Sequence, residues 1–101
     1  MKEPMATIPR IRRTVVVGNA PMGLHLRPAT AFAKLVRGLK CKVTLTHGDR
    51  RADGRSAFDL LGLLAPPGTE IILEVEGEDA DIALEPLCDI LTAEGEPGES
   101  P

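Results

Sequence analysis

The stretch GLHLRPA, residues 23–29, places a histidine where a turn gives way to a helix. The glycine allows the chain to turn, and the proline opens a segment, residues 29–39, with the apolar spacing of a helix. Proline is tolerated only in the first turn of a helix, where its missing N–H costs nothing. His25 is therefore predicted at the mouth of a helix N-terminus, whose first amides and macrodipole favour an anion. Together with the guanidinium of Arg27, this arrangement predicts a site that holds a phosphoryl group on histidine.

His25 and Arg27 also have simpler interpretations. A single histidine at a helix start is usually a cap or a solvated residue, and an arginine two positions later is usually solvated as well. The whole heptapeptide favours the phosphoryl site, because each of its residues fits the same geometry. The other histidine, His47, is predicted in a hairpin turn and has no assigned role.

The composition predicts one small domain with an aliphatic core. The 101 residues are 43% hydrophobic, with two phenylalanines and no tryptophan or tyrosine, so stacking on single-stranded nucleic acid is poorly supported. No apolar run approaches the roughly 20 residues that span a bilayer, and residues 1–13 lack the apolar core of a signal peptide. The two cysteines, Cys41 and Cys88, are too few for a disulfide framework or a metal site. We therefore expect a cytoplasmic protein with buried, reduced thiols.

The charges are unevenly distributed along the chain. All 12 Lys and Arg lie in residues 1–55, whereas residues 56–101 hold 12 of the 15 acids and no base. Within one domain the two segments must interleave and partly neutralise each other. The basic residues near His25 favour an anionic ligand or an acidic partner, and the net charge of −3 argues against nucleic acid. These basic residues are Arg27, Lys34, Arg37 and Arg55.

Hydrophobic periodicity predicts an α+β fold in the order β-α-β-β-α-β-α. We expect an antiparallel sheet of four strands with three helices on one face. Residues 1–10 are expected to form a mobile extension, 11–92 the domain and 93–101 an acidic disordered tail. The predicted strands are 11–18, 41–46, 50–53 and 69–76, and the helices are 29–39, a short apolar one through 58–64 that ends at 66–68, and 79–91.

The chain resembles HPr, the histidine-containing phosphocarrier family of the phosphoenolpyruvate-dependent phosphotransferase system. The resemblance covers about residues 11–92 and implies an open-faced β-sandwich. It implies a stoichiometric carrier of phosphoryl groups rather than an enzyme with turnover of its own, and no metal or cofactor. Besides residues 23–29, the matching features are Pro21, Arg55-Ser56 and the segment 77–79.

The resemblance also implies roles for individual residues. The phosphoryl group is placed on Nδ1 of His25, where the amides of Leu26 and Arg27 and the forked guanidinium of Arg27 hold its oxygens. A neutral imidazole can attack phosphorus without a separate base. Ser56 is predicted to cap the second helix with its hydroxyl, and in many members of the family the matching serine is phosphorylated by a dedicated kinase.

The implied partners are enzyme I, which supplies the phosphoryl group, and the A components of enzyme II complexes, which receive it. A kinase/phosphorylase acting on Ser56 is a further partner in part of the family. Neither nucleic acid nor membrane insertion is implied, and a monomer is expected. Phe58 is either a core residue or part of the docking face. The docking positions that match the family are Thr30, Lys34, Arg37, Ala57, Phe58 and Leu61.

Two residues depart from the family pattern. Leu26 stands where a small residue or threonine is usual, and its side chain could shield the phosphohistidine or alter the choice of partner. Pro86 falls inside the last predicted helix, where it cannot donate to the carbonyl of Ile82. With Ile82, Leu87 and Ile90 packed on the sheet, we expect a kinked helix or two short helices that meet just before the proline.

Three classes of function are compatible with the sequence. The first is a general phosphocarrier for sugar uptake. The second is an HPr-like module of a regulatory phosphorelay, nitrogen-linked or kinase-controlled, without sugar transport. The third is a non-catalytic α+β binding domain in which His25 is never phosphorylated, and the neighbouring Arg27 and Pro28 argue against it.

Overall fold

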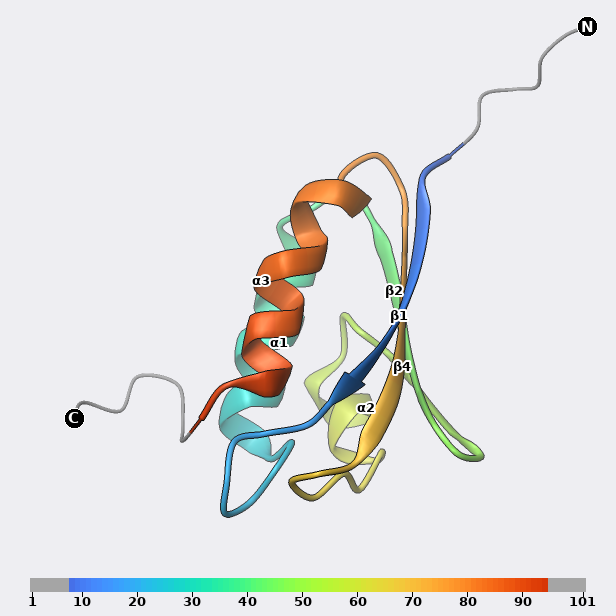
Figure 1. Cartoon of the computed structure of the whole chain (residues 1–101). Coiled ribbons are helices and arrows are strands. Elements are labelled where there is room, and N and C mark those ends of the chain that lie inside the picture. The colour runs from blue at the N-terminus through green and yellow to red at the C-terminus, as the bar shows by residue number, and fades with distance from the viewer. Residues whose placement is uncertain (1–7, 95–101) are drawn as a thin grey trace, which may run out of the picture.

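The computed structural model describes residues 8–94 as one antiparallel sheet covered on one face by helices (Figure 1). The strand order is β1-β4-β2-β3. This arrangement confirms the predicted fold class and the predicted order of elements. The elements are β1 (Arg10–Val16), α1 (Leu26–Arg37), β2 (Lys42–His47), β3 (Arg50–Asp53), α2 (Ala57–Leu61), β4 (Glu70–Glu76) and α3 (Ala80–Thr92).

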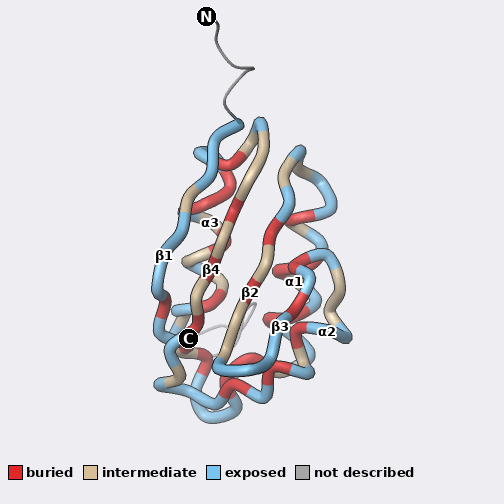
Figure 2. The backbone as a smooth tube through the Cα atoms, turned by 90° about the vertical axis from the view of Figure 1, so that its right-hand side faces the viewer, coloured by how far each residue is buried: buried red, intermediate tan, exposed pale blue. Residues whose placement is uncertain are grey.

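Strand β4 lies in the middle of the sheet, antiparallel to both β1 and β2. Because successive side chains of a strand point to opposite faces, Ile71, Leu73 and Val75 all face the helices and are fully buried. The intervening glutamates, Glu74 and Glu76, lie on the open face. Figure 2 views the molecule from this open side, with the helices behind the strands.

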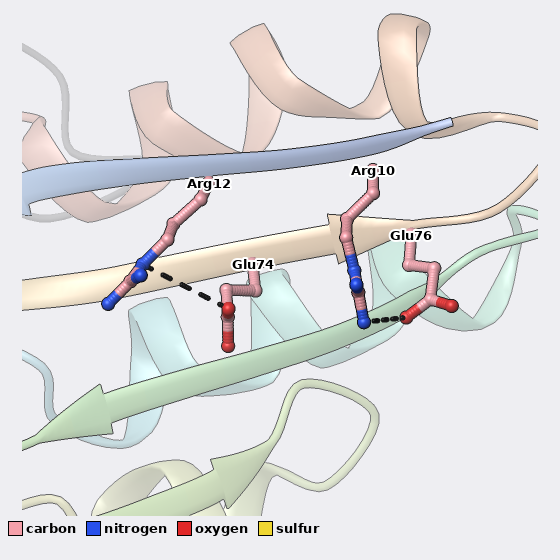
Figure 3. Close-up of polar contacts among 4 residues, drawn as sticks. All are labelled: Arg10, Arg12, Glu74 and Glu76. Atoms are coloured by element: carbon pink, nitrogen blue, oxygen red, sulfur yellow. Dashed lines mark ion pairs between the residues drawn. The ribbon is translucent and has the colours of Figure 1, made fainter. Parts of the chain in front are cut away.

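Ion pairs on the open face join the basic first strand to the acidic fourth one. Arg10 lies 3.6 Å from Glu76 and Arg12 lies 4.0 Å from Glu74 (Figure 3). These contacts confirm that the basic and acidic segments of the sequence interleave. All four side chains are substantially exposed, so each pair contributes between zero and about 1 kcal/mol to stability.

The core lies between the sheet and the helices α1 and α3. It is aliphatic except for Phe32 of α1, which is fully buried. Gly54 makes room for this ring: a Cβ atom there would lie 3.2 Å from Cε1 of Phe32 and 2.8 Å from Cβ of Val43.

Helix α3 continues through Pro86 as one helix, so of the two expected forms, a kinked helix or two short helices, the second is wrong. Its buried residues lie on both sides of the proline, and their packing on the sheet holds the two halves in one helix. The expected buried face is confirmed for Leu87 but wrong for Ile82, which is 64% exposed, and Ile90 is only partly buried. The helix instead turns its small residues and leucines inward: Ala80, Ala83, Leu84, Leu87 and Leu91.

Helix α2 ends at Leu61, earlier than the prolines at 66 and 67 predicted. The N–H of Gly62 closes the last turn by donating to the carbonyl of Asp59 at 2.9 Å. Leu64 then adopts a left-handed φ of 53°. The following segment is therefore a loop that leads to β4, and the prolines belong to that loop.

Three further expectations concern the ends of the chain and the thiols. Strand β1 already begins at Arg10, inside the expected N-terminal extension, and residues 1–7 and 95–101 of the two expected extensions lie outside the described residues. Cys41 and Cys88 are partly buried at the margin of the core rather than fully buried. Burial raises the pKa of both thiols, and the Asp79 carboxylate adds to the rise at Cys41. Within residues 8–94, no helix has the length and apolar character needed to cross a membrane.

Candidate phosphoryl site at the start of helix α1

His25 is the N-cap residue of α1, as its sequence context predicted. Its backbone is extended, with φ −102° and ψ −167°, and its carbonyl accepts the first helical hydrogen bond, from the N–H of Ala29 at 3.0 Å. The helix begins at Leu26, so Pro28 stands in its first turn. Because proline carries no N–H, the amides of Leu26 and Arg27 are the two that precede the helical ladder. The helix thus presents these two N–H groups and its positive end beside the imidazole.

The loop before His25 packs closely against the segment that precedes β4. Gly23 has a φ of +76°, and a Cβ atom on it would lie only 2.3 Å from the carbonyl oxygen of Ala65. The N–H of Leu24 donates to the same carbonyl at 2.9 Å, and the N–H of His25 donates to the carbonyl of Gly23 at 2.9 Å. Glycine is required at position 23 both by its conformation and by this close approach.

A shallow hollow surrounds His25 on the outer side of α1. The helix has no acidic residue in its first turn and carries basic residues along its exposed side, so its field favours an anion. Within the ring of His25, Nε2 is fully buried. The hollow is lined by Met22, His25, Leu26, Arg27, Thr30, Ala31 and Lys34.

Ser56 caps helix α2, as predicted. Its Oγ accepts a hydrogen bond from the N–H of Asp59 at 3.1 Å. The carboxylate of Asp59 does not return to the N–H of Ser56, which donates instead to the carbonyl of Asp53 at 3.0 Å. Asp59 accepts from the N–H of Asp53 at 3.3 Å. The Asp59 carboxylate, expected to complete a capping box with Ser56, instead stabilises the turn between β3 and α2.

The predicted docking residues lie on two helices that pack against each other. Thr30, Lys34 and Arg37 recur on the exposed side of α1, which packs against α2. Nε of Arg37 donates to the carbonyl of Arg55 at 3.0 Å and links α1 to the turn that precedes α2. Phe58 of α2 is 85% exposed, so its interpretation as a core residue is wrong. The other two positions, Ala57 and Leu61, are partly buried against the core.

The structure assigns contacts to two residues that the sequence did not single out or gave no role. Nδ1 of His47 lies 2.8 Å from the carbonyl oxygen of Leu63 and joins the end of β2 to the loop after α2. Asn19 is fully buried and bonds to the end of α3. One signal was available for Asn19: it is the only asparagine of the chain, which contains no glutamine, and it follows a glycine before a turn.

The chain was compared with known protein families, proteins and structures. The model of the family described as "PTS HPr component phosphorylation site" matches residues 11–93. The phosphocarrier protein NPr of Shewanella violacea is 34% identical over 84 residues, which cover 83% of this chain and 91% of that protein. A crystal structure of phosphocarrier protein HPr from Bacillus anthracis str. Ames has a TM-score of 0.75 at 24% identity, over 82% of this chain and 98% of that one.

A third relative is a part of a longer protein. The phosphoryl donor subunit DhaM of the PEP-dependent dihydroxyacetone kinase of Providencia stuartii is 41% identical over 69 residues, which cover 68% of this chain and 14% of that subunit. The fold and the histidine at a helix N-terminus define a small phosphocarrier protein. The chain belongs to the HPr family of the phosphotransferase system.

Proposed function

We propose that His25 takes a phosphoryl group on Nδ1 from enzyme I and passes it to the A components of enzyme II complexes. The observation that carries this proposal is the position of His25 as the N-cap of α1, with Nε2 buried. The imidazole therefore lies beside the amides of Leu26 and Arg27 and the positive end of the helix dipole, where a dianionic group is stabilised.

The transfer requires only one covalent step from the protein. The lone pair of Nδ1 attacks phosphorus, a new N–P bond forms, and the bond from phosphorus to the donor atom breaks with its electron pair left on the donor. The remaining work is positioning and charge stabilisation. Arg27 suits this task because its planar guanidinium can meet two phosphoryl oxygens at once. Onward transfer reverses these steps on the receiving protein.

The docking face of this proposal combines cations with exposed apolar side chains. Lys34 and Arg37 supply positive charge on α1, and Phe58 of α2 projects into solvent. Leu26 is 63% exposed beside the phosphoryl site, so it extends the apolar part of the same face. Such a surface fits an acidic partner with an apolar centre, because charges guide the encounter and buried aromatic anchors supply affinity.

Ser56 is proposed as a site of regulation in addition to its role as a cap. A phosphoryl group on Oγ would add negative charge at the start of α2, next to Phe58 and close to the acidic side chain of Asp59. That charge would oppose the binding of an acidic partner to the docking face. The expected result is slower uptake of phosphoryl groups from enzyme I.

A second candidate is a phosphorelay without sugar transport. The similarity to DhaM, a subunit named as a phosphoryl donor to a kinase system, supports this candidate. The chemistry at His25 would be unchanged, and only the receiving protein would differ. Transfer from the phosphorylated chain to each type of acceptor distinguishes the two.

The test is phosphorylation with phosphoenolpyruvate, Mg²⁺ and enzyme I, followed by measurement of acid-labile phosphate. We expect one phosphate per chain in the wild type and none in His25→Ala. His47→Gln is the matched control, because it removes the only other histidine, and it should be labelled like the wild type. Full labelling of His25→Ala would overturn the assignment, and so would a wild type that takes no label.

A further inference from the structure

Asn19 joins the end of helix α3 to the loop that carries His25. It is fully buried, and its Nδ2 donates to the carbonyl oxygens of Ile90 at 2.9 Å and Leu91 at 3.3 Å. Its backbone N–H donates to the carbonyl of Ala93. The last carbonyls of a helix have no N–H partner within the helix itself, and Asn19 supplies hydrogen-bond donors to those of α3. In Figure 1 the loop after β1 runs beside this end of α3.

The other side of Asn19 holds the turn that leads to the phosphoryl site. Its carbonyl accepts hydrogen bonds from the N–H of Met22 at 3.2 Å and of Gly23 at 3.0 Å. The carbonyl of Gly23 in turn accepts the N–H of His25 at 2.9 Å. A short chain of hydrogen bonds thus runs from the last turn of α3 through Asn19 to the backbone of the phosphoryl acceptor.

The residue type at position 19 is narrowly constrained. The backbone has a left-handed φ of 55°, which asparagine tolerates better than most residues other than glycine. Among the described residues Oδ1 accepts no hydrogen bond, so the side chain contributes through donation by Nδ2. Glycine would keep the backbone conformation and lose the donors. Aspartate would keep the shape and direct an acceptor at carbonyl oxygens on the negative end of α3.

We propose that Asn19 is a positioning residue for phosphoryl transfer, because it fixes the loop that sets His25 over the N-terminus of α1. The proposal rests on the proposed function, in which His25 carries the phosphoryl group. Asn19 does not touch the reacting atoms. It acts through Gly23, and its loss would let the imidazole move relative to the amides of Leu26 and Arg27. Displacements of about 1 Å at a reacting group can slow a reaction by roughly a hundredfold.

The test compares Asn19→Gly and Asn19→Asp with the wild type in steady-state phosphorylation by enzyme I. With the Asn19 variants as substrate, we expect the kcat of enzyme I to fall by about tenfold to a hundredfold. The KM of enzyme I for the variant should stay within about twofold, because the docking face is unchanged. Leu45→Ala is the control: Leu45 is a fully buried residue of β2, so the variant loses stability, and it takes no part in the hydrogen bonds of Asn19. At a temperature where all variants are folded, Leu45→Ala should keep the wild-type kcat.

A second readout follows the ring directly. The NMR signals of the His25 imidazole should shift in both Asn19 variants and stay in place in Leu45→Ala. Wild-type kcat in Asn19→Gly would overturn the proposal, as would an equal loss of kcat in Leu45→Ala, which would show a general effect of destabilisation. If Asn19→Asp does not fold, Asn19→Gly alone decides. Failure of the proposed function is distinct, since the wild type itself would then take no phosphoryl group on His25.

Discussion

Replacing Gly23 with alanine should disturb both the fold and the phosphoryl site. The added Cβ atom would lie 2.3 Å from the carbonyl oxygen of Ala65 and 2.7 Å from Cα of Pro66. Both are backbone atoms, which cannot rotate away as the end of a side chain can. Gly48 provides a matched control, because its φ of +61° is also left-handed but a Cβ atom there meets nothing within 4 Å. The difference between the two variants isolates the steric contact from the conformational cost.

The two contributions can be estimated separately. A left-handed backbone costs alanine roughly 1–2 kcal/mol, so Gly48→Ala should lose about that much and melt about 4–16 °C lower. Forcing an extra carbon into a tightly packed position adds about 1–3 kcal/mol. Gly23→Ala should therefore lose about 2–5 kcal/mol in total and melt at least about 8 °C lower. Because the strain falls on the backbone next to His25, its phosphorylation should slow as well.

Chemical denaturation followed by circular dichroism measures both losses, and the rate of phosphorylation by enzyme I measures the effect on the site. We expect Gly48→Ala to keep the wild-type rate, since Gly48 lies in the turn between β2 and β3 and an added Cβ there meets nothing within 4 Å. The reasoning is refuted if Gly23→Ala is no less stable than Gly48→Ala. It is equally refuted if Gly23→Ala is phosphorylated at the wild-type rate under conditions where it is folded.

Four other predictions follow from individual contacts. Arg27→Ala should keep its melting temperature within a few degrees, because the residue is exposed, and should slow phosphotransfer; unchanged rates in both directions would remove Arg27 from the site. Pro86→Ala should raise the free energy of unfolding by about 1–3 kcal/mol in urea, because it restores a helical donor in α3; a less stable variant would contradict this. Ser56→Ala should lose about 1 kcal/mol with the cap, and Ser56→Asp should bind enzyme I more weakly in calorimetry, whereas equal affinity would leave only the cap. The raised pKa of Cys41 and Cys88 should make both thiols react with iodoacetamide more slowly at pH 8 than in the urea-unfolded chain; equal rates would show that burial does not protect them.

The features predicted correctly from sequence are those set by neighbouring residues. The position of His25 follows from a glycine and a proline within a few residues of it, and the cap of α2 follows from Ser56 and Asp59. The alternation of β4 likewise fixed which side chains face the core. In each case the physical cause is local, so one short stretch contains all the information.

The errors and omissions concern contacts between distant segments. Ile82 has the apolar character of a core residue, but α3 turns Ala80, Ala83 and Leu84 toward the core and leaves Ile82 exposed. The exposure of Phe58 depends on which side of α2 meets α1. The partners of Asn19 lie 71 and 72 residues away, so its side-chain bonds were not predictable from the residues around it.

The most direct test of the central claim is to locate the phosphoryl group by ¹⁵N NMR on the protein phosphorylated by enzyme I. Coupling between phosphorus and a ring nitrogen identifies both the histidine and the atom that carries the group. The position of His25 at the start of α1, with its buried Nε2, predicts a single phosphorylated nitrogen, Nδ1 of His25. Phosphorus on Nε2 of His25, or on His47, would contradict the account.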